Sequence, residues 1–137
     1  MFEDRWGEGR GERGSNLVET ALVLVLLLLL LAGVADFGRA FHSYTVITNA
    51  AREGARYASR FPSDQTGIED TAIREAADSN VALERADITI IGLGGAAGNA
   101  IEVQVEYRIS TFLGGIIGLG ELPMRSATEM VVFGLDT

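Results

Sequence analysis

The chain has 137 residues, a formal net charge of −8 and no cysteine, and outside one long apolar segment it has room for about one small domain. The negative charge argues against a nucleic-acid surface, because phosphate binding requires clustered positive charge. The absence of cysteine excludes a disulfide framework, thiolate catalysis and a cysteine-based zinc site.

The first element in chain order is a polar, glycine-rich segment followed by an apolar run. The first fourteen residues hold four acidic residues against three arginines, and the run itself extends from Thr20 to Ala35. About twenty residues of this kind can cross the hydrocarbon core as a helix. A secretory signal would need a cationic start and a clear small-residue cleavage site after the run. The sequence therefore favours a retained transmembrane helix over residues 15–36.

Glu19 stands at the start of this run, five residues after Gly14. A membrane span tolerates a carboxylate where it has a partner or a role, because an unpaired charge in hydrocarbon is costly. The spacing suggests a segment that is cut after Gly14 and then used in an assembly through Glu19. The alternative is a carboxylate at headgroup depth without a function.

A single long helix is predicted from about Leu17 to Arg60, because the first helix breaker after the apolar run is Pro62. Its second half is amphipathic. The stripe expected to face a core consists of Phe37, Phe41, Tyr44, Thr48, Ala51, Ala55 and Ala58. Arg52, Arg56 and Arg60 recur every fourth residue on another stripe, which we interpret as a solvated face.

A short second helix is predicted from Thr66. Thr66 and Glu69 have the spacing of a capping box, in which a hydroxyl and a carboxylate each satisfy free backbone donors. The helix is expected to fray near residues 78–80. The residues expected to face the core are Ile68, Ala72, Ala76 and Leu83.

The last third of the chain has the alternating pattern of β-strands. Apolar residues alternate with polar ones at about 88–90 and 101–109, a pattern typical of a sheet with one buried and one wet face. A third strand is expected at about 124–133. Residues 92–99 would form the first hairpin loop. The apolar residues 112–120 would form a short helical turn resting on the sheet or on the membrane. These elements predict an α+β fold in which the long helix packs on a small antiparallel sheet.

No catalytic, cofactor or metal constellation is recognised. Gly92, Gly94 and Ala97 resemble a dinucleotide-binding fingerprint, but the next predicted element is a strand, whereas the fingerprint needs a helix. His42 is the only histidine, so a pair of histidine metal ligands cannot form. We expect no enzyme, no metal, no cofactor and no small-molecule substrate.

Three segments around the apolar run carry a resemblance to a known family. They are residues 13–19, 36–40 and 49–56. The chain from about Arg13 to Ala58, a third of its length, resembles the TadE-like proteins, pilin-related subunits of the tight-adherence (Tad) pilus of bacteria. The resemblance implies a pilin-like fold, and the C-terminal part matches the family only in general layout.

The resemblance also implies a domain organisation and a location. Residues 1–14 would be a prepilin-type leader, residues 15–36 the transmembrane part of the long helix, and residues 37–137 an extracytoplasmic α+β domain that includes the rest of that helix. The protein would cross the bacterial cytoplasmic membrane once, with its C-terminal domain outside the cytoplasm. Arginines flank the apolar run on both sides, so charge counts alone do not determine the orientation.

The resemblance further implies a processing site and an assembly contact. A prepilin peptidase would cut between Gly14 and Ser15, which makes Glu19 the fifth residue of the mature chain. In pilin-like assemblies this glutamate meets the N-terminal ammonium of a neighbouring subunit. Two charges that are each costly in lipid become tolerable as a pair, and the pairing sets the axial register between helices.

The leading hypothesis is a membrane-stored, pilin-like subunit, a minor pilin that primes or tips a Tad-type pilus for surface adhesion. Its expected partners are other pilin-like subunits, the pilus assembly machinery, the prepilin peptidase and membrane lipid. The alternative is an uncleaved bitopic membrane protein whose outer domain is an assembly scaffold or a binding module. A secreted enzyme released near Ala35 is the least favoured hypothesis, because no catalytic constellation is present.

Overall fold

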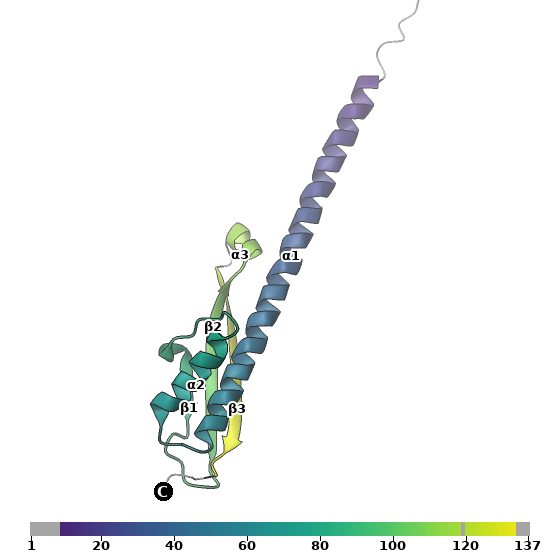
Figure 1. Cartoon of the computed structure of the whole chain (residues 1–137). Coiled ribbons are helices and arrows are strands. Elements are labelled where there is room, and N and C mark those ends of the chain that lie inside the picture. Colours follow the sequence, from purple (N-terminus) through teal and green to yellow (C-terminus); the bar gives the residue numbers. More distant parts are fainter. Residues whose placement is uncertain (1–8, 119, 134–137) are drawn as a thin grey trace, which may run out of the picture.

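Helix α1 (Gly9–Ala58) is a single helix of 50 residues in the computed structural model, which describes residues 9–118 and 120–133. At 1.5 Å per residue it is about 75 Å long. Its first half projects away from the other elements, and its second half lies against them (Figure 1). The predicted continuous helix is confirmed, and it begins before the expected start at Leu17.

Three antiparallel strands form one sheet in the order β1-β2-β3. Strand β1 (Ile88–Ile91) pairs with residues 102–105 of β2 (Ala100–Ser110), whereas β3 (Glu121–Val131) pairs with β2 along its whole length. The inward-facing side chains of β2 are buried against α1, as their alternation predicts. All three predicted strands are confirmed, and the third begins at Glu121.

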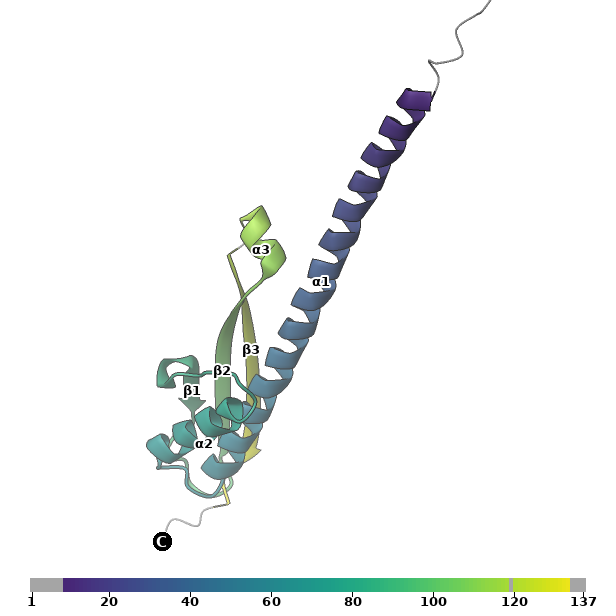
Figure 2. The same cartoon turned by 45° about the horizontal axis from the view of Figure 1, so that its top comes forward.

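The core lies between the second half of α1, helix α2 (Gln65–Ala77) and one face of the sheet (Figure 2). Its α1 side consists mainly of fully buried small residues, whose short side chains let the other elements approach. Gly54 lies where α1 approaches both β2 and α2 closely, because a Cβ there would lie 3.2 Å from Val103 Cγ1 and 3.4 Å from Ala72 Cβ. The buried alanines of α1 are Ala50, Ala51, Ala55 and Ala58.

The predicted core-facing stripe of α1 is correct only in its C-terminal part. The three alanines of the stripe are fully buried, but Phe37, Phe41 and Tyr44 are exposed by 72, 64 and 49%. The reason is the shape of the sheet. Strand β1 pairs only with residues 102–105 of β2. Near Phe37, therefore, only the tip of the β2–β3 hairpin lies beside α1, and most of the helix circumference remains uncovered.

The predicted capping box of the second helix is wrong. Helix α2 begins at Gln65, and its N-cap is Asp64, whose carboxylate accepts hydrogen bonds from Gly67 N at 3.0 Å and from the Tyr57 hydroxyl at 2.8 Å. A carboxylate at the N-cap is a strong acceptor for the free amide three residues later, so it displaces Thr66 from that role. The predicted core residues Ile68, Ala72, Ala76 and Leu83 are all buried, and the helix ends just before residues 78–80.

The apolar segment between β2 and β3 forms the short helix α3 (Phe112–Ile117), which confirms the predicted helical turn. The Thr111 hydroxyl caps it by accepting a hydrogen bond from Gly114 N at 3.0 Å. The helix does not rest on the sheet but lies beside α1 (Figures 1 and 2). With the 3₁₀ turn η1 (Arg85–Asp87), the architecture is α+β and pilin-like: a long apolar helix packed on a three-stranded antiparallel sheet with short extra helices.

Candidate membrane-anchoring and assembly site

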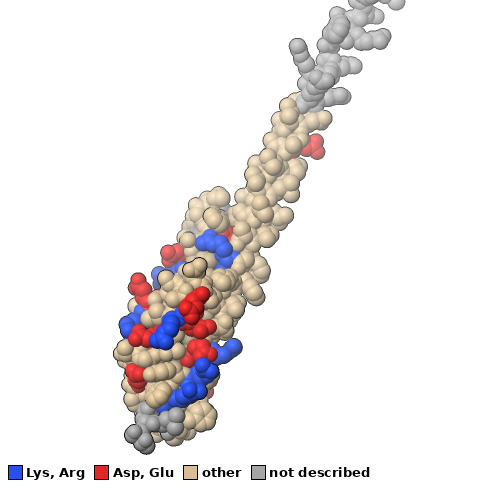
Figure 3. All heavy atoms as spheres, viewed as in Figure 1, with Lys and Arg blue, Asp and Glu red and all other residues tan. Residues whose placement is uncertain are grey.

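The first half of α1 presents apolar side chains on all sides. Every leucine and valine from Leu17 to Leu31 is exposed by 41% or more. Figure 3 shows this stretch as almost entirely uncharged, whereas charged side chains gather on the rest of the molecule. Within the described residues, α1 is the one helix long and apolar enough to cross a membrane, judged by length and composition. This arrangement is consistent with a single-pass membrane anchor.

The three candidate site residues all lie within the first part of α1. Gly14, Ser15 and Glu19 are exposed, and the helix continues through all of them. Ser15 and Glu19 are four residues apart, so they lie on the same helical face about one turn from each other. No other described side chain forms a hydrogen bond or an ion pair with the Glu19 carboxylate. The carboxylate is therefore available to a group that the rest of the described chain does not supply.

Packing does not account for the glycine at position 14. A Cβ at Gly14 would meet no heavy atom within 4 Å, so a larger side chain would fit the subunit. Each glycine in a helix interior costs about 1 kcal/mol relative to alanine, and Gly9 and Gly11 precede it in α1. These glycines therefore make the first turns of α1 less stable as a helix than alanine at the same positions would.

Asp36 connects the end of the apolar run to the β2–β3 hairpin. Its carboxylate is 8% exposed and accepts hydrogen bonds from the backbone N–H groups of Phe112 and Leu113, each at 2.8 Å. Arg39 lies 4.0 Å from the same carboxylate, and its guanidinium stands 5.0 Å from the centre of the Phe112 ring. A buried charge is tolerable when donors surround it. The sequence assigned no structural role to Asp36, because its partners are 76 and 77 residues away.

A second polar cluster holds α2 to the turn that follows it. The Glu69 carboxylate, 7% exposed, accepts hydrogen bonds at 2.7 Å from Gln65 Nε2 and at 2.7 Å from Arg85 Nη1. These two bonds, the first from Gln65, lower the pKa of Glu69 below its ordinary value. The pKa of Asp64 is also lowered, first by the Gly67 N–H and then by the Tyr57 hydroxyl. Both carboxylates are therefore stabilised in their charged forms.

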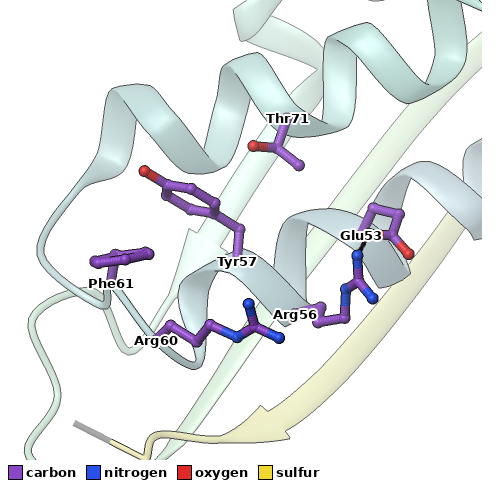
Figure 4. A pocket seen from close by; sticks show the side chains of 6 residues that line it. All are labelled: Glu53, Arg56, Tyr57, Arg60, Phe61 and Thr71. Atoms are coloured by element: carbon purple, nitrogen blue, oxygen red, sulfur yellow. Dashed lines mark ion pairs between the residues drawn. The ribbon is translucent and has the colours of Figure 1, made fainter. Parts of the chain in front are cut away.

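The arginine stripe of α1 is exposed, as predicted for a solvated face. Arg56 pairs with Glu53 at 2.8 Å, beside a shallow hollow between α1 and α2 (Figure 4). The hollow measures about 180 Å³, whereas pockets for small ligands usually measure about 300–1,000 Å³. It is therefore smaller than a usual binding pocket for a small ligand. Its lining residues are Glu53, Arg56, Tyr57, Arg60, Phe61 and Thr71.

A comparison with known protein families gives one match. The TadE-like protein family matches residues 14–56. The chain carries a TadE-like domain. This domain covers about a third of the chain, begins at Gly14 and includes Glu19, the apolar run and Asp36. Searches of curated proteins and of solved structures find no match.

The TadE-like family is pilin-like, and its members are generally non-enzymatic structural proteins associated with the Tad pilus machinery. The TadE-like domain of this chain ends at Arg56, near the end of α1. Strands β1 to β3 and helix α2 therefore lie outside it. Among the described residues, no group of three or more histidines and acids is placed to hold a metal ion.

Proposed function

We propose that the protein is a pilin-like subunit stored in the bacterial cytoplasmic membrane and used as a minor pilin that primes or tips a Tad-type pilus for surface adhesion. The observation that carries the proposal is the TadE-like domain over residues 14–56, in which Glu19 stands at the start of an apolar run whose side chains are exposed on all sides of α1. Residues 1–14 would be the leader, 15–36 the membrane part and 37–137 the outer domain.

Processing would create the second charge of the assembly contact. Cleavage between Gly14 and Ser15 leaves an ammonium group on Ser15, about 6 Å along the helix axis before Glu19. That ammonium and the Glu19 carboxylate lie on one face, so they can pair within one chain or between neighbouring chains. Pairing between chains would align neighbouring helices axially, because each charge is costly in lipid without the other.

Mass spectrometry of the N-terminus tests the processing step. In protein extracted from the native membrane or from sheared pili, we expect Ser15 as the first residue. Replacing Gly14 by leucine should leave a precursor heavier by the fourteen-residue leader, because a peptidase needs the extended chain to approach closely. An intact leader in mature filaments would contradict the proposal.

Stoichiometry tests the minor role separately. A priming or tip subunit should be present at a few copies per filament, so quantitative mass spectrometry of sheared pili should find far less of it than of the main subunit. An abundance equal to that of the main subunit would contradict the minor role while leaving the pilin-like assignment intact.

The second candidate function is an uncleaved bitopic membrane protein with an outer scaffold or binding domain. One observation favours it: α1 runs as unbroken helix through the Gly14–Ser15 bond, so a peptidase would have to open the helix first. The same N-terminal measurement separates the two candidates, because this one requires the leader to remain on the protein in the membrane.

A further inference from the structure

The tip of the β2–β3 hairpin has the chemistry of a lipid contact rather than of a water-exposed loop. From Phe112 to Gly120 the sequence contains no charged residue. Helix α3 exposes Phe112 by 59% and Ile116 by 70%, and Leu122 just beyond it is exposed by 47%. Large apolar side chains gathered at one end of a domain usually mark a binding or membrane surface.

Helix α3 is attached to α1 at the end of the apolar run. Leu113 Cδ1 lies 3.4 Å from the position that a Cβ would take at Gly33, and Asp36 binds two backbone N–H groups at the start of α3. Figures 1 and 2 show α3 at the end of the domain that faces the free half of α1. The apolar surface of α3 thus continues the apolar surface of α1.

The length of α1 places this attachment at a membrane boundary. From Leu17 to Asp36 the helix rises about 28 Å, close to the roughly 30 Å thickness of the hydrocarbon core. A span that begins at Leu17 therefore ends near Asp36, at the level of α3. Arg39, whose side chain is 47% exposed, lies one turn farther out, where a guanidinium can meet lipid phosphates.

We propose that α3 is a second membrane contact, in which Phe112 and Ile116 insert into the boundary between headgroups and acyl chains beside α1. This inference rests on the proposed membrane location of α1. The hydrogen bonds of Asp36 hold the two contacts together, so the stored subunit is attached at two points and its domain keeps one orientation to the bilayer. Lipid is favoured over a second protein copy because the α3 surface is continuous with the lipid-facing part of α1 and lies at its boundary.

Depth-dependent fluorescence quenching tests this inference on the full chain. The one native tryptophan, Trp6, is replaced by phenylalanine, and single tryptophans are introduced as Ile116→Trp, Leu27→Trp or Phe133→Trp. Ile116 and Phe133 are exposed by 70 and 74%, so neither substitution disturbs the core. Phe133 follows β3 at the opposite end of the domain, and its backbone N–H bonds to the Ser59 carbonyl at the end of α1. Phe133→Trp is therefore the matched control, with a tryptophan that is expected to lie in water, away from the membrane.

Each variant is reconstituted into phosphatidylethanolamine–phosphatidylglycerol vesicles that contain lipids brominated near the headgroups or near the chain ends. We expect Ile116→Trp to emit at shorter wavelength than Phe133→Trp and to be quenched mainly by bromine near the headgroups. Leu27→Trp should be quenched mainly by deep bromine, and Phe133→Trp by neither.

The outcomes separate this inference from the proposed membrane anchor. Quenching of Leu27→Trp without quenching of Ile116→Trp overturns the α3 contact and leaves the anchor intact. Quenching of Ile116→Trp alone overturns the anchor and, with it, the proposed attachment at two points. If neither is quenched, both are wrong. If the emission of Ile116→Trp shifts with protein concentration but bromine does not quench it, a second copy covers α3 and the lipid contact is overturned.

Discussion

The two halves of α1 are both apolar, yet they are built from different residues for different surroundings. From Leu17 to Leu31 the helix consists mainly of leucine and valine, and these side chains are exposed. From Ala50 to Ala58 the buried positions hold alanine and glycine, which bring the sheet and α2 close to the helix axis. Asp36 lies between the two halves and connects the helix to the β2–β3 hairpin.

The comparison shows that apolar character alone does not identify the environment of a helix. Long side chains suit a helix that faces lipid, because they fill the surrounding space without any close neighbour. Short side chains suit a helix under a sheet, because close packing requires the backbones to approach. Side-chain size therefore separates the anchor half from the core half, and the following variants test that separation.

The largest effect is expected for Glu19→Gln, in the anchor half. If Glu19 pairs with a neighbour's ammonium, the variant leaves that ammonium unpaired in a low-dielectric site, a loss of about 3–5 kcal/mol for a broken buried pair. Membrane insertion and leader cleavage should be unchanged, because the span becomes more apolar and the cleaved bond is five residues away. The measurement is the fraction of processed protein in sheared pili.

The matched control for Glu19→Gln is Glu129→Gln, the same change at a position of β3 outside the anchor half. It should enter pili at the wild-type level. Normal incorporation of the Glu19→Gln protein would show that Glu19 is not the assembly contact, and the anchor half would then have only a membrane role.

The next effect is expected for Gly54→Val, in the core half. The Cβ alone would lie 3.2 Å from Val103 Cγ1, so the added methyl groups must displace β2 or α2. Overpacking of this kind costs about 1–3 kcal/mol. The free energy of unfolding, measured by urea titration in detergent, should fall by that amount.

The control for Gly54→Val is Gly38→Val, in the same helix, where a Cβ would meet nothing within 4 Å. Glycine and valine differ only modestly in helix propensity, so this variant should keep wild-type stability. Equal losses in both variants would contradict the assignment of the Gly54→Val loss to packing against β2 and α2.

An effect of the same size, confined to one hydrogen bond, is expected for Asp36→Asn at the junction. The amide retains one acceptor oxygen, so one of the two N–H groups of Phe112 and Leu113 loses its partner, at about 1–3 kcal/mol. We expect faster amide hydrogen exchange at Phe112 and Leu113, with unchanged exchange in β1. The control Asp78→Asn, at the exposed C-cap of α2, should leave both regions unchanged. Wild-type exchange in Asp36→Asn would mean that the junction depends on Leu113 packing alone.

The smallest effect concerns pH and lies wholly in the core half. Because the folded state lowers the pKa of Glu69 and Asp64, their contribution to stability is present above the ordinary carboxylate range of about 3.9–4.3 and is lost as the pH falls through the lower folded values. The urea midpoint should therefore decrease on acidification below this range. The urea midpoint of the Glu69→Gln variant should fall less steeply with decreasing pH. If its dependence on pH equals that of the wild type, the assigned role of Glu69 is contradicted.

Local patterns predicted most of the secondary structure. The long helix was predicted from the absence of a helix breaker, the strands from a period of two, and the turns from glycine-rich segments. Each of these patterns involves residues only a few positions apart. The error at the start of α2 has a local cause as well. Thr66 matched the capping pattern, but Asp64 lies two residues earlier, and its carboxylate accepts the bond from Gly67 N that fixes the start of the helix. A carboxylate is a better N-cap acceptor than a threonine hydroxyl.

The sequence by itself determined that a long apolar helix precedes a small antiparallel sheet, and it singled out Gly14, Ser15 and Glu19, because these features depend on composition and short spacing. Only the tertiary structure decided which face of α1 is covered. Phe37, Phe41 and Asp36 are separated from the hairpin tip by more than seventy residues. Contacts across such a distance depend on where the sheet ends, and the periodicity of one helix does not determine that.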